Sequence, residues 1–431
     1  MADQGGSQHG IARTSRVRTE EQKNRDLERI ARYHELEDQV RARVAQGDYS
    51  SAVFQLTSKL LRLNPEYYTI WNVRRRCLIS GSFSKPSAGS SCSTACLTSS
   101  PTATTAPSSI SCLSSSSATT PPAPGLPTAG KSGTTADPTV AAAAEPPGAI
   151  ESAPSEAESH DFTTLKSELA FTIPLLLESP KCYWIWSYRL WILQQAIARL
   201  RPALARTVWE EELGLASKML GKDRRNFHAW GYRRHVVGQL ESRSLQGSSM
   251  VEAEFAYTDR MIKSDLSNFS AWHSRSRLIP RLLEERAADE AARRAFLDKE
   301  FQQIREALNV GPEDQSLWYY HQFLVLNLVY PDKHPAMTPG FTVHDRVAYL
   351  KREIDEIKEL LEDYADIQLI YEGLFEYTLY LCQLERRNPK ADERADLVEW
   401  LAKLKQLDPM RRGRWADLER EHELTAGGSD V

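Results

Sequence analysis

The sequence predicts an all-α fold, a right-handed α-α superhelix assembled from helical hairpins. One motif recurs along the 431 residues: a residue suited to a turn or a helix cap is followed, seven positions later, by tryptophan. In the last four of the five copies, the motif tryptophans Trp186, Trp230, Trp272 and Trp318 are 44, 42 and 46 residues apart, which is the period of a helical repeat array. The five copies are NPEYYTIWNVRRRCL (64–78), SPKCYWIWSYRLWIL (179–193), DRRNFHAWGYRRHVV (223–237), DLSNFSAWHSRSRLI (265–279) and GPEDQSLWYYHQFLV (311–325).

A second amphipathic segment precedes each copy of the motif, for example VWEEELGLASKML (208–220) and LDKEFQQIREAL (297–308). Apolar residues recur in these segments at steps of three and four, as on one face of a helix. Each repeat is therefore a helical hairpin, and stacked hairpins bury a continuous core. Further helices are expected near 18–46, 343–363, 366–386 and 392–407, and DPMRRGRW (408–415) is a degenerate further copy of the motif.

A long insertion separates the first repeat from the second. Residues 86–130 contain no charged side chain and are mostly Ser, Thr, Ala, Pro and Gly. Such a segment cannot bury enough apolar surface to offset its ordering entropy, so we expect it to be disordered. The predicted organisation is a flexible N-terminus (1–17), an N-terminal helix with the first repeat (18–80), the insertion (81–160), repeats two to five with C-terminal helices (161–425) and a flexible tail (426–431).

The composition excludes several classes of protein. The 54 basic and 58 acidic side chains give a formal net charge of −4, which argues against a general nucleic-acid binder. No apolar run approaches the roughly 20 residues that span a bilayer, and no signal peptide opens the chain, so we expect a cytoplasmic protein. No HExxH, P-loop or GxGxxG motif is present. The chain on its own reads as a binding scaffold or as a subunit that completes another protein's active site.

Two recurring side chains have competing interpretations. One large aromatic per repeat is what an interlocking core requires, so we expect the tryptophans to be core. The residue three positions after each tryptophan is Arg74, Arg189, Arg233 or Arg275, and then His321. It shares a helix face with the tryptophan and could stack on an aromatic ring and reach backbone carbonyls as a link between repeats. An electropositive surface for a partner or an anion is the alternative.

The start of the second helix of each hairpin carries the candidate binding residues. Four positions after the expected cap stand aromatics, including Tyr68, Tyr183 and Phe227, which could line a shared rim or pack in the core. Two positions after the cap stand Lys181 and Arg225, where a first helical turn normally favours acids. A cation beside free backbone N–H groups can bind phosphate, so an anion contact competes with a chance surface placement.

The cap, the aromatic and the W-x-x-R pattern together resemble the repeat of protein prenyltransferase α subunits. The resemblance covers roughly 11–79 and 161–425. Within that family, HGIARTSRVRTEEQKNRDLERIARYHEL (9–36) and LDPMRRGRWADLE (407–419) are similar to the terminal segments of the α subunits of Rab, or type II, geranylgeranyltransferases. His9 and Gly10 match the N-terminal His-Gly of that group, although eight residues precede them here.

The resemblance implies a heterodimer that is inactive without its β subunit. The α subunit wraps around a β subunit that holds Zn²⁺ and most of the lipid pocket. The complex would transfer geranylgeranyl from geranylgeranyl diphosphate to C-terminal cysteines of Rab GTPases presented by Rab escort protein. Deleting residues 84–160 should leave the association with β intact. The alternatives are the α subunit shared by farnesyltransferase and type I geranylgeranyltransferase, and a non-catalytic helical-repeat scaffold.

The resemblance also implies roles for individual residues. Lys181 matches the family lysine that contacts the prenyl diphosphate, and Tyr183 matches the tyrosine beside it. Tyr68 sits where the preceding repeat supplies a tyrosine near the site. Phe227 and His228 match an aromatic–histidine pair near the lipid, and Phe227 replaces a tyrosine of farnesyltransferases.

Overall fold

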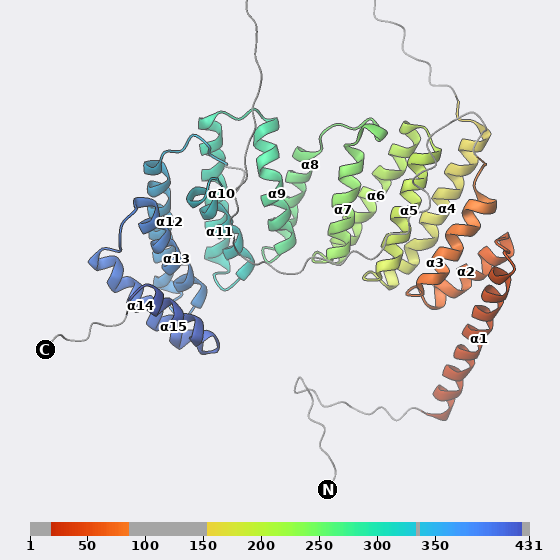
Figure 1. The fold of residues 1–431 in the computed structure, drawn as a ribbon, viewed down its shortest axis with the longest axis horizontal. Helices are drawn as coiled ribbons and strands as arrows, with labels where there is room; N and C mark the ends of the chain where they lie inside the picture. The colour runs from red at the N-terminus through yellow and green to blue at the C-terminus, as the bar shows by residue number, and fades with distance from the viewer. Residues whose placement is uncertain (1–18, 86–152, 333–336, 425–431) are drawn as a thin grey trace, which may run out of the picture. The chain divides into compact units, whose positions relative to one another are not determined.

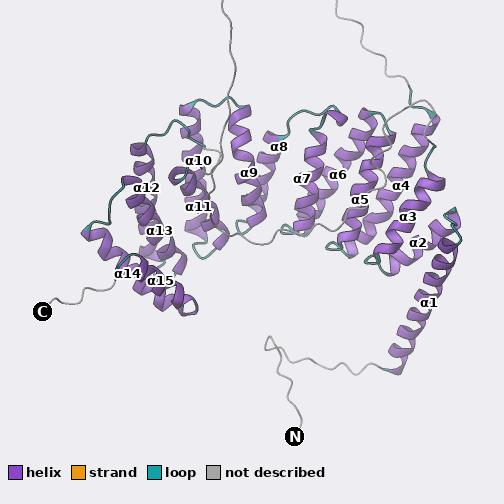
Figure 2. Cartoon of the chain, viewed as in Figure 1, coloured by secondary structure: helices purple, strands orange, loops and turns teal. Residues whose placement is uncertain are grey.

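The computed structural model describes residues 19–85, 153–332 and 337–424 (Figure 1). Within these ranges the secondary structure is helical, without strands (Figure 2), so the predicted all-α fold is confirmed. The helices are α1 (Glu20–Ala45), α2 (Ser51–Leu63), α3 (Tyr68–Cys77), α4 (Glu156–Glu178), α5 (Tyr183–Arg199), α6 (Pro202–Lys222), α7 (Phe227–Leu240), α8 (Val251–Ser264), α9 (Phe269–Glu285), α10 (Glu290–Val310), α11 (Gln315–Val329), α12 (Val343–Asp363), α13 (Gln368–Glu385), α14 (Ala391–Leu407) and α15 (Arg412–Glu421). A π-helical turn (η1, Leu78–Ser82) and two 3-10 turns (η3, Arg243–Leu245; η4, Pro409–Arg411) complete the set.

Consecutive helices pair into hairpins, α2 with α3 and so on to α12 with α13 (Figure 1). Helices α4 and α5 are joined by Arg189, which donates to the Leu169 carbonyl at 2.7 Å. The pair α12–α13 is a complete sixth hairpin that the tryptophan pattern did not reveal. Tyr371 takes the place of the tryptophan there, and its hydroxyl donates to the Ala365 carbonyl at 2.8 Å. Helix α1 precedes the hairpins, begins with a capping box at Thr19 and packs its C-terminal part through the buried Val40.

The helix boundaries correct one expectation from the sequence. The residues interpreted as N-caps end the preceding helix instead: Asn64, Asp223, Asp265 and Gly311 are the C-cap positions of α2, α6, α8 and α10. The second helix of each hairpin begins four residues later, capped in three repeats by Asn226, Asn268 and Asp314. A tight turn occupies the residues between. It closes with a backbone hydrogen bond across three residues, for example from Asn226 to Asp223 at 3.1 Å.

The recurring tryptophans are buried, as expected of core residues, and they also close the turns. Each indole Nε1 donates to a carbonyl six residues earlier, within the turn; for Trp71 the acceptor is Pro65 at 2.8 Å. The ring packs against the next repeat, as Trp71 does against Tyr188, with 4.6 Å between ring centroids. At the fifth repeat the facing residue is Gly373, where a Cβ atom would lie 2.8 Å from the Trp318 ring. The tryptophan therefore fixes both a turn and the spacing to the next hairpin.

The recurring arginines link neighbouring repeats. Arg74 donates from Nε and Nη2 to Glu168 at 2.7 and 2.8 Å, and Tyr188 donates to the same carboxylate at 2.6 Å. All three side chains are buried. The same group recurs along the array. Each arginine pairs with a glutamate on the first helix of the following hairpin, and in three of the four cases a tyrosine on the second helix of that hairpin donates to the same glutamate. The pairs are Arg74–Glu168, Arg189–Glu212, Arg233–Glu254 and Arg275–Glu300. His321 continues the series with Glu353 at 3.3 Å.

The structure thus favours the inter-repeat link over an electropositive surface for these arginines. The expected contact with an aromatic ring is present, and the rings belong to first helices: Arg74 stacks on Phe54 at 3.9 Å and on Phe171 at 4.1 Å.

Both ends of the expected insertion are helical. The π-helical turn reaches Ser82, and α4 begins at Glu156. Ser82 and His160 meet, with 2.8 Å between the Ser82 carbonyl and the His160 ring. The segment between, 86–152, lies outside the described residues, as do the two expected flexible termini at 1–17 and 426–431. Across the described parts of the chain, no helix has the length and apolar character that crossing a membrane requires.

Candidate functional site

Lys181 lies in the turn between α4 and α5, two residues before α5 begins. It is therefore outside the first helical turn, and the expected conflict between a cation and the helix dipole does not arise. Its side chain is 72% exposed, and its Nζ lies 3.7 Å from Asp223 Oδ2, in the corresponding turn of the next repeat. The ammonium is held near the surface by the next hairpin and remains open to solvent.

Aromatic side chains from three repeats form a continuous row beside Lys181. Trp184 lies between Tyr68 and Tyr183, with ring centroids 4.3 and 5.1 Å away. Tyr183 is 6.3 Å from His228, and His228 is 3.9 Å from Phe227. We call the row formed by Tyr68, Trp184, Tyr183, His228 and Phe227, together with Lys181, the rim. The structure thus joins four residues that the sequence nominated separately, Tyr68, Tyr183, His228 and Phe227, and Lys181 lies two residues before Tyr183.

Exposure decides between the two interpretations of the rim aromatics. Tyr68, Tyr183 and Phe227 are all among the large exposed hydrophobic side chains, and Phe227 is 69% exposed. Core packing does not explain them, because between 43% and 69% of each side chain is exposed to solvent. The rim is an apolar surface, with a cation at its edge, that is available to another molecule.

Burial keeps two titratable groups at or next to the rim, His228 and Cys182, in their uncharged forms. Burial lowers the pKa of His228, and the nearby Glu66 carboxylate offsets part of that drop. His228 is therefore neutral at neutral pH. Burial raises the pKa of the Cys182 thiol to about 11. Cys182 is consequently no nucleophile at neutral pH, and Lys181 is the group of the rim that carries positive charge.

Arg225 repeats the arrangement of Lys181 one hairpin further along the chain. It lies in the turn before α7, is largely exposed, and its Nη2 is 3.6 Å from Asp265 Oδ1 in the following turn. Lys181 and Arg225 thus occupy equivalent positions in successive turns.

Three residues at the rim escaped the sequence analysis. Trp184 joins the aromatic side chains of two repeats, and its position within the aromatic-rich stretch was the only signal for it. Asp223 was interpreted as a helix cap, although its carboxylate faces Lys181. Asn226 was not considered, although its side chain donates to the carbonyl of Pro180, next to Lys181, at 3.1 Å.

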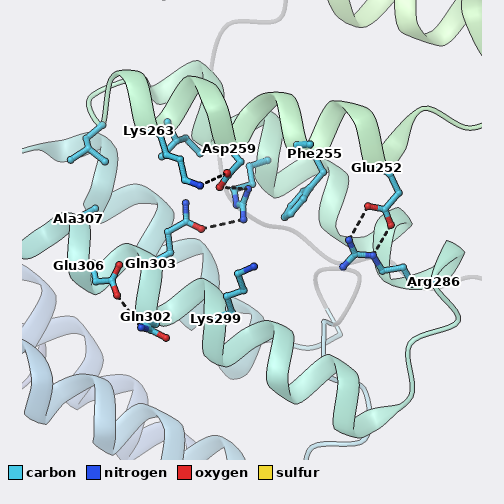
Figure 3. A pocket seen from close by; sticks show the side chains of 14 residues that line it. Glu252, Phe255, Asp259, Lys263, Arg286, Lys299, Gln302, Gln303, Glu306 and Ala307 are labelled. Carbon is cyan, nitrogen blue, oxygen red and sulfur yellow. Dashed lines mark hydrogen bonds and ion pairs between the residues drawn. The ribbon is translucent and has the colours of Figure 1, made fainter.

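A separate cavity of about 620 Å³ lies between the first helices α8 and α10 (Figure 3). Its lining mixes apolar side chains with charged ones, and charged groups pair with one another: Arg286 donates to Glu252 at 2.6 Å, and Lys263 lies 2.8 Å from Asp259. None of the nominated site residues lines it. The cavity is therefore not part of the rim.

The structure places no metal ligand set at the rim. Among the residues that the structure describes, no group of three or more His, Cys, Asp or Glu side chains could hold a metal ion. His9 lies outside the described residues. Zinc bound by a partner subunit stays a prediction.

The sequence pattern of the protein prenyltransferase alpha subunit repeat matches this chain five times, at residues 51–80, 165–196, 209–240, 251–282 and 297–328. The chain belongs to the protein prenyltransferase α-subunit family. Each match covers one hairpin, from α2–α3 to α10–α11, so the family's repeats are the structural repeats of this fold.

Two relatives match nearly the whole chain, and a third matches about half of it. A Candida albicans protein named geranylgeranyl transferase type-2 subunit alpha is 25% identical over 95% of this chain and 97% of its own length. The protein of the same name from Dictyostelium discoideum is 26% identical over 95% and 99%. The Schizosaccharomyces pombe protein of that name is 29% identical over 49% of this chain, and the match spans 62% of its length.

A solved structure has the same fold. The chain is similar to the Candida albicans protein geranylgeranyltransferase-I complexed with GGPP, with a TM-score of 0.50 and 16% identity over 92% of this chain and 91% of that one. At that identity the likeness concerns the fold alone.

Proposed function

We propose that this chain is the α subunit of a heterodimeric type II geranylgeranyltransferase. The complex transfers geranylgeranyl from geranylgeranyl diphosphate to C-terminal cysteines of Rab GTPases presented by Rab escort protein. The observation that carries this proposal is the pair of full-length relatives from Candida albicans and Dictyostelium, both named as type II α subunits. The resemblance to a type I enzyme rests on the fold and does not favour the shared α subunit over this assignment.

The rim supplies the chemistry that an α subunit adds to this reaction. During transfer the cysteine sulfur bonds to C1 of the lipid, the C1–O bond breaks and diphosphate leaves with the bonding electrons. The exposed ammonium of Lys181 stabilises the negative charge that develops on the leaving oxygen, a contact that strengthens in the transition state. The hydroxyl of Tyr183 is a second donor beside it. Zinc in the β subunit, when bound, activates the acceptor thiol as thiolate.

The β subunit is expected to cover the face formed by the second helices of the hairpins. The helices α3, α5, α7 and α11 contain no aspartate or glutamate. Arg234 on α7 and Arg277 on α9 are exposed on this face. Burial lowers the pKa of Arg234, with no carboxylate offsetting the effect. Burial also lowers the pKa of His273, and the two arginines lower it further. The acid-free helices α3, α5, α7 and α11 fit a partner surface that carries carboxylates, whereas α9 ends with Glu284 and Glu285.

Co-expression with candidate β subunits tests the proposed function. The chain should copurify with a type II β subunit. The heterodimer should then transfer lipid to a Rab with paired C-terminal cysteines only when escort protein is present. A Rab whose two cysteines are replaced by serine is the matched control. Efficient transfer to a CaaX peptide without escort protein would indicate the shared farnesyltransferase and type I subunit instead.

A further inference from the structure

The turn that carries Lys181 is held by the next hairpin. The Asn226 side chain, only 2% exposed, donates from Nδ2 to the Pro180 carbonyl at 3.1 Å. Its Oδ1 accepts from the backbone N–H groups of His228 and Ala229 at 3.0 and 3.2 Å, which caps α7. Trp186 donates to the same Pro180 carbonyl at 3.0 Å. The backbone immediately before Lys181 is therefore fixed by two buried side chains.

Asp223 fixes the other end of Lys181, its ammonium. One carboxylate oxygen, Oδ1, accepts from the backbone N–H of Arg225 at 3.2 Å, which sets the orientation of the carboxylate. The other oxygen, Oδ2, faces Lys181 Nζ at 3.7 Å. An ion pair this exposed adds little to folding stability. Its distinctive property is geometric, because the acid cannot turn away from the lysine without losing its own backbone bond.

A buried asparagine and an aspartate make the same two contacts around Arg225, the cation of the following turn. Asn268, also buried, donates to the Arg224 carbonyl at 3.1 Å, and Asp265 lies 3.6 Å from Arg225. The turn that carries Glu66 lacks this pair. There the Cys182 thiol takes the place of the asparagine and lies 3.5 Å from the Pro65 carbonyl. The clamp of asparagine and aspartate thus accompanies the turns that present a cation.

We propose that Asp223 is a positioning residue that acts through Lys181. A lysine ammonium has three donors. The Asp223 carboxylate, 3.7 Å away, attracts the ammonium from one side, and the donors of the ammonium remain for diphosphate oxygens at the edge of the rim. The fixed carboxylate thereby orients the ammonium, while its own negative charge opposes binding of the anionic ground state. This inference rests on the proposed function, because it assigns the diphosphate to Lys181.

The decisive test separates lipid binding from the chemical step. Asp223→Asn keeps the oxygen that accepts from Arg225 but turns an NH₂ group toward Lys181. In the heterodimer with its β subunit, we expect the single-turnover transfer rate to fall about tenfold, because a misplaced catalytic contact loses much of its effect. The affinity for geranylgeranyl diphosphate should stay the same or rise by up to about fivefold, because a competing charge is gone. Loss of the turn itself would weaken both quantities, and that result would overturn the proposal.

A double-mutant cycle supplies the second readout. In the Lys181→Ala background, Asp223→Asn should change the single-turnover rate by less than about twofold, because the group it positions is absent. A further loss of about tenfold there, or a single variant Asp223→Asn with the wild-type rate, would also overturn the proposal. Asp396→Asn, which breaks the exposed pair with Lys358 at 2.7 Å, is the control and should leave both quantities unchanged. A wild-type heterodimer that transfers no lipid would instead count against the proposed function.

Discussion

Replacing Arg74 with methionine should weaken the docking of the first repeat on the second. The guanidinium binds Glu168 through two donors and also reaches the hydroxyls of Thr57 and Ser58 at 3.0 and 2.7 Å. Arg74→Met leaves the buried Glu168 carboxylate with Tyr188 as its remaining donor among these residues. Removing one partner of a buried ion pair costs about 3–5 kcal/mol. Because repeats of such arrays contact mainly their neighbours, the loss should be local to α2 and α3.

Native-state amide hydrogen exchange of the isolated chain measures this local loss. At 1.4 kcal/mol per factor of ten, about 3 kcal/mol lowers protection in α2 and α3 roughly 100-fold, whereas α10–α13 should be unaffected. Arg76→Met removes an exposed arginine, hydrogen-bonded to Tyr49, from the same helix and should change protection little. The double variant Arg74→Met/Glu168→Met should regain most of the protection, because no charge is then left buried. A loss below about 1 kcal/mol for Arg74→Met alone would refute the role of the link.

Three further predictions concern the site and its partner. Lys181→Ala should lower the single-turnover rate of the heterodimer about 100-fold or more while changing lipid affinity less, and an unchanged rate would refute its role at the leaving group. Arg234→Glu should lower the affinity of the chain for its β subunit in titration calorimetry, and high salt should lower that of the wild-type chain. Lys218→Glu, a charge reversal on the exposed side of α6, is the control and should leave the affinity unchanged. Because burial lowers the pKa of His228, protonation favours the unfolded chain. The free energy of unfolding should therefore fall as pH drops below about 6.5. His228→Gln should make that fall smaller in urea titrations at pH 7.5, 6.0 and 5.0. An equal dependence of the unfolding free energy on pH in the variant and the wild type would contradict the lowered pKa of His228.

Periodicity predicted the hairpins because one bulky side chain per repeat is required wherever hairpins stack. The same rule failed at the sixth hairpin. There Tyr371 makes the bond to the turn that an indole makes elsewhere, and the small Gly373 accepts the ring of Trp318. A pattern written as tryptophan could not detect a repeat that meets the same packing requirement with other residues.

The position of the turns could not be obtained from residue preferences. Aspartate and asparagine suit both ends of a helix as well as turns, so Asp223 fitted an N-cap as well as the C-cap that it occupies. Helix α5 begins four residues after the residue interpreted as its N-cap, so Lys181 lies before the helix and not in its first turn. The argument from the helix dipole therefore does not apply to Lys181. The role of Lys181 itself stays a prediction, and the structure shows only that it is exposed, two residues before Tyr183.

Contacts between repeats were the least predictable part of the site. Asp223 and Trp184 matter through residues of a neighbouring repeat, Lys181 and Tyr68, which are 42 and 116 positions away in the sequence. A single sequence gives the period of such an array but not which side chains meet across it. The buried glutamates that receive the arginines were hidden for the same reason, since they stand among many acidic residues on the first helices.

The sequence separation of the linked residues gives an estimate of how much the long insertion costs in folding free energy. The arginine–glutamate links within the continuous part of the array join residues 21 to 25 positions apart, whereas Arg74 and Glu168 are 94 apart. For a flexible loop the entropy of closure grows only with the logarithm of length, so a fourfold longer loop costs about 1.2 kcal/mol more. That amount is smaller than the cost of leaving one partner of a buried arginine–glutamate link unpaired, about 3–5 kcal/mol. A segment of this size can therefore enter between two hairpins with a small effect on stability, provided that the link across it is kept.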